Sequence, residues 1–215
     1  MKMDKTAGEP SIQLPEDIAA LILSSFRDGG NDVLQQNGMV IWMTGLSGSG
    51  KSTIARLLEK KLAEKNLFSV VLDGDELRKT LNRDLGFSDI DRTENIRRAA
   101  ELAKLLVQKN IIVICSFITP MQKHRDLAAT ITGEKYFEVS VNCPLYVCEQ
   151  RDVKGLYHKA RNHEITDFTG IGSAYQPAVS PDLVLNTAVE TPEESAEKLL
   201  DCVFPIVKTE SKQQS

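Results

Sequence analysis

The chemistry of this sequence centres on residues 45–52, where two glycines, a lysine and a serine stand at fixed spacing. The stretch Gly45-x-x-x-x-Gly50-Lys51-Ser52 follows an apolar run and precedes a helix-forming segment. Glycine lets the backbone turn so that successive N–H groups face an anion, and the start of the helix adds a positive dipole end. This pattern is typical of a phosphate-binding P-loop, in which the lysine reaches the β- and γ-phosphates and the serine hydroxyl ligates Mg²⁺. The predicted nucleotide-binding residues are Gly45, Ser47, Gly48, Ser49, Gly50, Lys51, Ser52 and Thr53, with Ser52 as the metal ligand.

A pair of carboxylates, Asp73 and Asp75, follows the next apolar run along the chain. A carboxylate at a strand end beside a P-loop can hold Mg²⁺ or orient an attacking hydroxyl. An Asp-Gly step is also ordinary turn chemistry, but its position after the P-loop helix favours a role in the site. The sequence leaves open how the two carboxylates divide these roles.

Four further side chains, Arg78, Arg92, Asn95 and Lys154, form a candidate set for binding an anion. Arginine matches phosphate or sulfate with two parallel hydrogen bonds. The chain as a whole is mildly acidic, with 26 Lys and Arg against 30 Asp and Glu. This balance argues against non-specific nucleic-acid binding, so an anionic ligand has to meet a local cluster of this kind.

Strand-like and helix-like segments alternate about five times along the chain. This alternation predicts an α/β, three-layer P-loop NTPase fold, with a roughly five-stranded parallel sheet and helices on both faces. The expected strands are 39–43, 68–73, 111–117, 136–141 and 183–185. The expected helices are 53–65, 76–83, 91–109, 121–132, 144–151 and a last one opened by the capping box Thr191-x-x-Glu194. Ligands of such sheets gather at the carboxyl ends of the strands.

The predicted organisation has three parts: an N-terminal tail and helix over 1–37, the P-loop domain over 38–208, and a disordered tail over 209–215. Within the domain, residues 152–176 combine basic residues and glycines with little apolar periodicity, which predicts a mobile flap. The N-terminus has no apolar signal region, and no apolar run is long enough to span a membrane. A cytoplasmic protein without a membrane partner is therefore expected.

Several stretches beyond the P-loop carry a resemblance to a known family. They are Leu-Asp-Gly-Asp-Glu-Leu-Arg (72–78), Leu-Asn-Arg-Asp-Leu-Gly-Phe-Ser (81–88), Asp-Arg-Thr-Glu-Asn-Ile-Arg-Arg (91–98), Ser-Phe-Ile-Thr-Pro (116–120), Arg-Asp-Val-Lys-Gly-Leu-Tyr-His-Lys-Ala-Arg (151–161) and Asp-Phe-Thr-Gly-Ile (167–171). Together they resemble the adenylylsulfate (APS) kinases, and the resemblance covers about residues 38–205. The Leu-Gly-Phe-Ser, Asn-Ile-Arg-Arg and Lys-Gly-Leu-Tyr segments are far more specific than the P-loop.

The resemblance implies a reaction in sulfate activation: ATP, with Mg²⁺, donates its γ-phosphoryl group to the 3′-hydroxyl of APS, giving 3′-phosphoadenylylsulfate (PAPS) and ADP. Phe87 and Phe168 would stack on the two faces of the adenine. Ile118 and Thr119 would present backbone groups, and Lys154 would move in with the flap. The implied acceptor-binding residues are Asp75, Arg78, Phe87, Arg92, Asn95, Ile118, Thr119, Lys154 and Phe168. The implied catalytic residues are Asp75, Lys51 and Asp73. A homodimer is implied by the resemblance as well.

The sequence departs from the family pattern on the acceptor side. Thr119 stands where the family commonly has serine, Met121-Gln122 stands where it has Tyr-Arg, and residues 172–177 differ from its Asp-x-Pro-Tyr-Glu-x-Pro. A related P-loop kinase acting on another nucleotide or a small alcohol is therefore the alternative. A nucleotide-sensing or inactive regulatory paralogue is a third hypothesis, although the chain has no Asn-Lys-x-Asp segment to read guanine.

Overall fold

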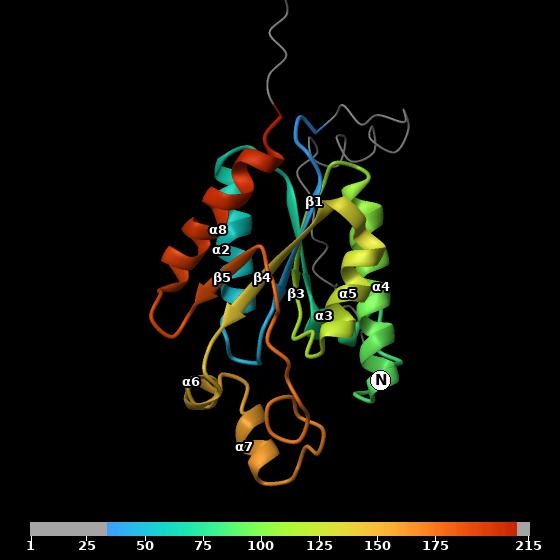
Figure 1. Ribbon diagram of the computed structural model, residues 1–215, viewed down its shortest axis with the longest axis vertical. Coiled ribbons are helices and arrows are strands. Elements are labelled where there is room, and N and C mark those ends of the chain that lie inside the picture. The colour runs from blue at the N-terminus through green and yellow to red at the C-terminus, as the bar shows by residue number, and fades with distance from the viewer. Residues whose placement is uncertain (1–33, 210–215) are drawn as a thin grey trace, which may run out of the picture. The chain divides into compact units, whose positions relative to one another are not determined.

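The alternation of apolar runs and helical segments produces a parallel sheet between two layers of helices (Figure 1). The computed structural model describes residues 34–209. Within that range the strands are β1 (Met39–Thr44), β2 (Ser69–Asp73), β3 (Ile112–Ser116), β4 (Tyr136–Asn142) and β5 (Leu183–Asn186). Neighbouring strands are parallel and lie in the order β2-β3-β1-β4-β5. The predicted fold class is confirmed.

The helices cover both faces of this sheet. In the described residues they are α2 (Lys51–Glu64), α3 (Gly74–Lys79), α4 (Asp89–Val107), α5 (Gln122–Thr132), α6 (Leu145–Arg151), α7 (Leu156–Arg161) and α8 (Pro192–Val207), with a 3-10 turn η1 (Gly133–Lys135). Helices α2 and α8 lie on one face, and α4 and α5 lie on the other (Figure 1). Each face therefore has its own apolar core.

The central strands β1 and β3 are buried along their whole length. Alternate residues of β1 serve the two cores: Ile41 and Met43 pack on the α2–α8 side, whereas Val40 and Trp42 pack on the α4–α5 side. Trp42 stacks on Phe117, directly after β3, with ring centroids 5.1 Å apart. Strands covered on both faces are apolar throughout because no side of them meets water. The loops that follow β1 and β3 thus start from a rigid base.

The strand order brings three functional segments together. Strand β3 lies between β2 and β1, and Ser116 at its end is in register with Asp73 on β2 and Met43 on β1. The P-loop, the carboxylate pair and the loop after β3 therefore leave the same edge of the sheet side by side, as the rule for open α/β sheets predicts.

Side-chain caps set the starts of α4 and α8. Helix α4 begins at Asp89, earlier than the predicted Asp91, because the Ser88 hydroxyl accepts a hydrogen bond from Asp91 N at 3.2 Å and caps the first turn. The predicted capping box of α8 is confirmed: Thr191 Oγ1 accepts from Glu194 N at 3.2 Å, and the glutamate side chain bonds back to Thr191 N at 2.8 Å.

Residues 152–176 contain more packed structure than their composition indicated. They include α7, and the rings of Tyr157 and Phe168 meet edge-on with centroids 4.9 Å apart. Both rings are buried with Leu46 and Cys148 in a small core separate from the two beside the sheet. We call residues 152–176 the flap; its mobility stays a prediction.

Gln36 lies just before the predicted start of the domain at residue 38. Gln36 is buried, and its side chain donates to Phe68 O and to Asn110 O, each at 2.7 Å. The predicted N-terminal helix, and the tails apart from Thr209, lie outside the described residues. A helix apolar and long enough to cross a membrane is not found in residues 34–209.

Candidate active site

Two glycines determine the shape of the loop that joins β1 to α2. The φ angle of Gly45 is 155°, and a Cβ atom there would lie 2.6 Å from Val141 O. Gly50, with a φ of 102°, stands immediately before the first residue of α2. Residues with side chains rarely adopt these angles, so glycine is what lets the loop lead straight into the positive end of the helix.

Lys51 points back into this loop. Its Nζ donates to Gly45 O at 2.8 Å and to Leu46 O at 2.7 Å, and the side chain is buried. Burial lowers the pKa of Lys51 from 10.5 to about 8. The ammonium group is thus held by neutral carbonyl groups, which the phosphate oxygens of a nucleotide can replace as stronger, charged acceptors.

The Ser52 hydroxyl reaches the first carboxylate of the pair. It donates to Asp73 Oδ2 at 2.6 Å, and Ser116 Oγ lies 3.2 Å from it. The other oxygen, Asp73 Oδ1, accepts from Asp75 N at 2.9 Å and caps α3, which therefore starts directly after Asp73 instead of at the predicted residue 76. Burial by itself raises the pKa of Asp73, but the hydrogen bonds and the charge of Lys154 together lower it by more, so the pKa lies below its ordinary value. Asp73 is thus an ionised carboxylate beside a hydroxyl.

The second carboxylate, Asp75, faces the flap. It forms an ion pair with Lys154, and both side chains are more than half exposed. The two carboxylates therefore have different surroundings: Asp73 is bonded to the P-loop helix, whereas Asp75 is open to solvent and paired with a cation from the flap.

An exposed ring stands between two of the predicted anion-binding arginines. The Phe87 side chain is 61% exposed, and the guanidinium carbons of Arg78 and Arg92 lie 4.5 and 5.8 Å from its ring centroid. Arg78 Nη1 donates to Gly86 O at 2.7 Å, and Arg92 Nε donates to Phe87 O at 2.8 Å. The two cations hold this loop in place and give the ring a strongly positive surrounding.

Arg92 also joins this loop to the flap. Its Nη2 donates to Asp167 O at 2.6 Å and its Nη1 donates to Thr169 Oγ1 at 3.0 Å. Phe168, between these two partners, is only 8% exposed because its ring packs on Tyr157. Arg92 thus contacts the segments of both Phe87 and Phe168, the two residues predicted to stack on the adenine. Little of Phe168, however, is open to a ligand.

Asn95 is buried although it was predicted beside Arg92 on the acceptor-binding face. Its Oδ1 accepts from Asn82 Nδ2 at 2.9 Å, and both side chains are buried. The structure therefore places Asn95 beneath the turn that follows α3, where it holds this turn against α4.

The loop after β3 is held from the inside. Thr119 has a φ of 43°, which is uncommon for a β-branched residue, and it is 1% exposed. Its Oγ1 accepts from Trp42 Nε1 at 2.9 Å, and its carbonyl oxygen accepts from Arg125 Nη1 at 2.9 Å. The carbonyl oxygen of Ile118 accepts from Thr44 Oγ1 at 2.9 Å. The Thr119 hydroxyl therefore faces the interior, away from any ligand at this edge of the sheet.

Three side chains that the sequence did not single out support the P-loop. Each donates to a carbonyl oxygen of the loop: Tyr157 Oη to Ser47 O at 2.9 Å, Arg151 Nη1 to Gly48 O at 3.5 Å, and Thr187 Oγ1 to Ser49 O at 2.8 Å. Tyr157 and Arg151 lie in the family-like stretch 151–161, which was a usable signal. Thr187 follows β5 without any motif, so only the packing reveals it.

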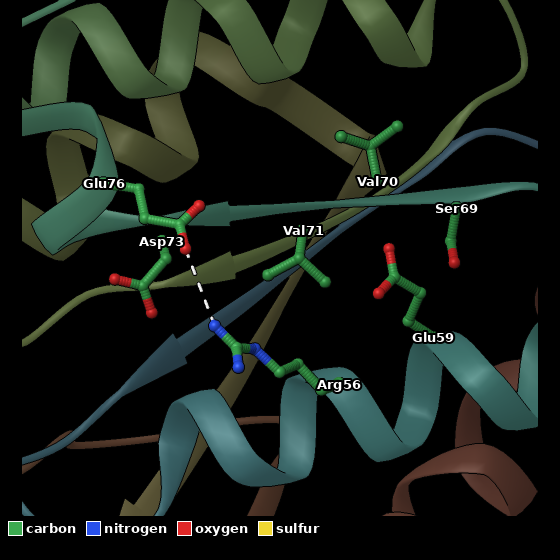
Figure 2. A pocket seen from close by; sticks show the side chains of 7 residues that line it. All are labelled: Arg56, Glu59, Ser69, Val70, Val71, Asp73 and Glu76. Carbon is green, nitrogen blue, oxygen red and sulfur yellow. Dashed lines mark ion pairs between the residues drawn. The ribbon is translucent and has the colours of Figure 1, made fainter. Parts of the chain in front are cut away.

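A hollow of about 300 Å³ lies beside this site, between α2 and the edge strand β2 (Figure 2). It is lined by Arg56, Glu59, Ser69, Val70, Val71, Asp73 and Glu76. Arg56 from α2 and Glu76 from α3 form an ion pair across it at 3.6 Å, as Figure 2 shows. Asp73 is the one lining residue shared with the phosphate site, so this hollow flanks that site instead of containing it.

The sheet order, the P-loop and the hydroxyl–carboxylate pair behind it define a P-loop kinase. The family model described as adenylylsulphate kinase matches residues 37–186. The chain therefore belongs to the adenylylsulphate kinase family, and the resemblance seen in the sequence is confirmed.

Relatives of this family are similar to most of the chain. An adenylyl-sulfate kinase of Halothermothrix orenii is 55% identical over 166 residues, which cover 77% of this chain and 89% of that protein. One from Bacteroides fragilis is 49% identical over 182 residues, covering 84% and 90%. The APS kinase CysC of Mycobacterium tuberculosis, solved in complex with AMPPNP and APS, is 48% identical with a TM-score of 0.76, covering 78% of this chain and 98% of that one.

Two segments that depart from the family pattern lie against each other. Gln122 N donates to Gln176 Oε1 at 2.9 Å, and Gln176 N donates to Pro120 O at 2.7 Å. The departures thus meet at one junction, between the loop after β3 and the end of the flap.

Proposed function

We propose that this kinase transfers the γ-phosphoryl group of ATP to the 3′-hydroxyl of APS, with PAPS and ADP as products. The observation that carries the proposal is that contacts join two half-sites. On the donor side, Ser52 of the P-loop helix is bonded to Asp73, and the nearby Asp75 pairs with Lys154 of the flap. On the acceptor side, Arg92 joins the loop of Phe87 to the same flap. Relatives that cover most of the chain are named adenylyl-sulfate kinases, and one was solved with AMPPNP and APS.

The donor half binds the triphosphate. The amide groups of residues 45–53 surround the phosphates, and the ammonium group of Lys51 stabilises the negative charge that develops on the γ-phosphoryl group during transfer. The Ser52 hydroxyl and the ionised Asp73 carboxylate are two hard oxygen ligands held 2.6 Å apart, a donor set that fits Mg²⁺. Bound there, Mg²⁺ would neutralise charge on the β- and γ-phosphates.

The acceptor half orients the attacking hydroxyl. Asp75 is the carboxylate that remains open, so it accepts the hydrogen bond and then the proton of the 3′-hydroxyl. Lys154, the ion-pair partner of Asp75, turns to the anionic acceptor when the acceptor binds. We thus assign Asp73 to the metal and Asp75 to the hydroxyl.

The remaining predicted residues bind or position APS. Phe87 stacks on the adenine, and Arg78 and Arg92 beside it bind the phosphosulfate. Phe168 covers the other face of the base when its ring leaves part of its contact with Tyr157. Asn95, Ile118 and Thr119 act mainly by holding the loops that surround the acceptor.

Three further properties stay predictions within this proposal. Residues 38–208 form the catalytic domain, the protein is a homodimer, and it acts in the cytoplasm. Sedimentation of the purified full chain with and without both substrates tests the dimer.

An acceptor panel tests the reaction. The full chain is incubated with ATP, Mg²⁺ and one acceptor at a time: APS, AMP, adenosine or a small alcohol. We expect ADP and PAPS with APS and little ADP with the others. ADP formation with another acceptor but not with APS would favour the related-kinase alternative. ATP binding without ADP formation in any arm would favour a regulatory paralogue.

A further inference from the structure

Arg125, in the first turn of α5, is fully buried although it was not predicted to bind either substrate. Its guanidinium reaches groups on separate parts of the chain. They are Thr119 O at 2.9 Å from Nη1, Gln122 Oε1 and Pro177 O at 2.8 and 3.1 Å from Nη2, and Glu138 Oε1 at 3.3 Å from Nε.

The ion pair with Glu138 does not by itself explain a buried arginine. Glu138 lies on β4 and its side chain is largely buried as well. Burying two charges costs about as much as their attraction returns, and apolar side chains of similar size are often as stable. What an apolar side chain lacks is a planar set of donors that can bind carbonyl groups on different segments at once.

The first of these carbonyl groups belongs to the loop after β3. Thr119 has left-handed backbone angles, and such a conformation persists only where the surroundings hold it. Trp42 holds its hydroxyl and Arg125 holds its carbonyl group. This loop is the segment proposed to lie against the acceptor.

The second carbonyl group belongs to Pro177, directly after the flap. The neighbouring Gln176 is hydrogen-bonded to the same loop, through Gln122 N and Pro120 O. Arg125 therefore lies beneath a junction where the trailing end of the flap meets the loop after β3. The flap also carries Lys154 and Phe168, so the positions of these two side chains depend on how firmly the trailing end of the flap is held.

We propose that Arg125, paired with Glu138, is a positioning residue for phosphoryl transfer: it fixes the acceptor loop and the trailing end of the flap relative to each other. The inference rests on the proposed function and assigns it a residue that touches neither substrate. Because its trailing end is held at this junction, the flap closes on the acceptor in one geometry. Lys154 and Phe168 on the flap therefore reach the acceptor at a high effective concentration.

The test uses variants that separate positioning from folding. Arg125→Met with Glu138→Leu removes both buried charges together, so neither is left unpaired. Arg125→Lys keeps a cation for Glu138 but lacks the fork of donors. Gln176→Ala, at an exposed position, removes only the outer bond to Gln122. Arg97→Met is the matched control, since Arg97 is an exposed arginine paired with Glu94 on α4.

We expect the double variant to raise the KM for APS and lower kcat, each by about tenfold or more, while the KM for ATP changes by less than about twofold. Gln176→Ala should shift the KM for APS in the same direction by a smaller factor, and Arg125→Lys should restore part of the loss. Trypsin provides a second readout, because Lys159 and Arg161 are cleavage sites within the flap. APS should protect these sites in wild type and in Arg97→Met, but not in the double variant.

Equal changes in the KM for ATP and APS, or flap protection by APS in the double variant, would overturn the role of Arg125. If the double variant does not fold, an unchanged KM for APS in both Arg125→Lys and Gln176→Ala overturns it as well. Failure of the proposed function has a different signature: the wild-type protein itself would form no PAPS.

Discussion

Ser52 Oγ and Asp73 Oδ2 lie 2.6 Å apart, and this hydrogen bond ties the first turn of the P-loop helix to the end of the edge strand β2. Because one oxygen of Asp73 is bonded to Ser52 and the other caps α3, its carboxylate has a single orientation. The carboxylate of Asp75, two residues later, makes neither bond and instead pairs with Lys154 of the flap. Two residues of chain thus separate the carboxylate that we propose for the metal from the one that we propose for the acceptor hydroxyl.

The two carboxylates should respond differently to Mg²⁺. Asp73→Asn is expected to lower kcat by about 10²–10³-fold and to raise the Mg²⁺ concentration needed for half-maximal rate. Asp75→Asn should lower kcat by about 10²–10⁴-fold without changing that concentration. Initial rates over a Mg²⁺ titration separate them. The same Mg²⁺ shift in both variants would contradict the assignment.

Binding of ATP should weaken as pH rises through about 8. Burial lowers the pKa of Lys51 from its ordinary 10.5 to about 8. A bound triphosphate favours the charged form and raises this pKa, so affinity is highest where Lys51 is already protonated. Above about pH 8 the affinity should fall by up to about tenfold per pH unit. Calorimetry in buffers of different ionisation enthalpy would also show proton uptake on binding.

Lys51→Arg is the control for this pH dependence. A guanidinium keeps its charge over the whole range, so the variant should bind ATP with an affinity that does not change near pH 8. A fall like that of the wild type would mean that another group titrates.

The two phenylalanines assigned to the adenine should differ in stability. Phe168→Ala is expected to cost about 3–5 kcal/mol in the free energy of unfolding, because its ring is buried against Tyr157. Phe87→Ala should change that free energy little, because Phe87 is 61% exposed, but it should raise the KM for APS. Urea unfolding and steady-state kinetics measure the two effects. Similar losses of stability would show that Phe87 is packed as well.

Thr119 should not carry a phosphoryl group during turnover. Its hydroxyl is buried and accepts a hydrogen bond from Trp42 Nε1. Mass spectrometry after incubation with ATP and Mg²⁺ should find Thr119 unmodified. Thr119→Val should cost about 1–3 kcal/mol in stability, because the indole N–H loses its acceptor inside the core. A phosphothreonine at this position would contradict the direct transfer proposed above.

Much of the fold was predictable because local patterns carry it. The apolar runs at β1 and β3, the glycines of the P-loop and the capping box at Thr191 each act over a few residues. The start of α3 was wrong by contrast, because the Asp73 side chain caps it only after β2 has placed that side chain at the strand end. A cap depends on conformation as well as on residue type.

The residues of the candidate site also fall into those that local patterns predict and those that only packing places. Spacing alone pointed to Lys51, Ser52 and the carboxylate pair, since a P-loop and its neighbouring strand end are short segments. It did not show that Asn95 is buried or that Phe168 packs on Tyr157. Those outcomes depend on which helix lies over which turn.

By itself, the sequence determined the phosphate-binding loop, the order of strands and helices along the chain, and the family, because periodicity, glycine placement and short motifs act locally. Tertiary structure alone decided that Asp73 turns to Ser52 while Asp75 turns to Lys154, and that Arg125 meets Pro177. These partners are far apart in the chain. Whether they meet depends on strand order, on the packing of α5 against the sheet, and on the cost of leaving a buried polar group without a partner.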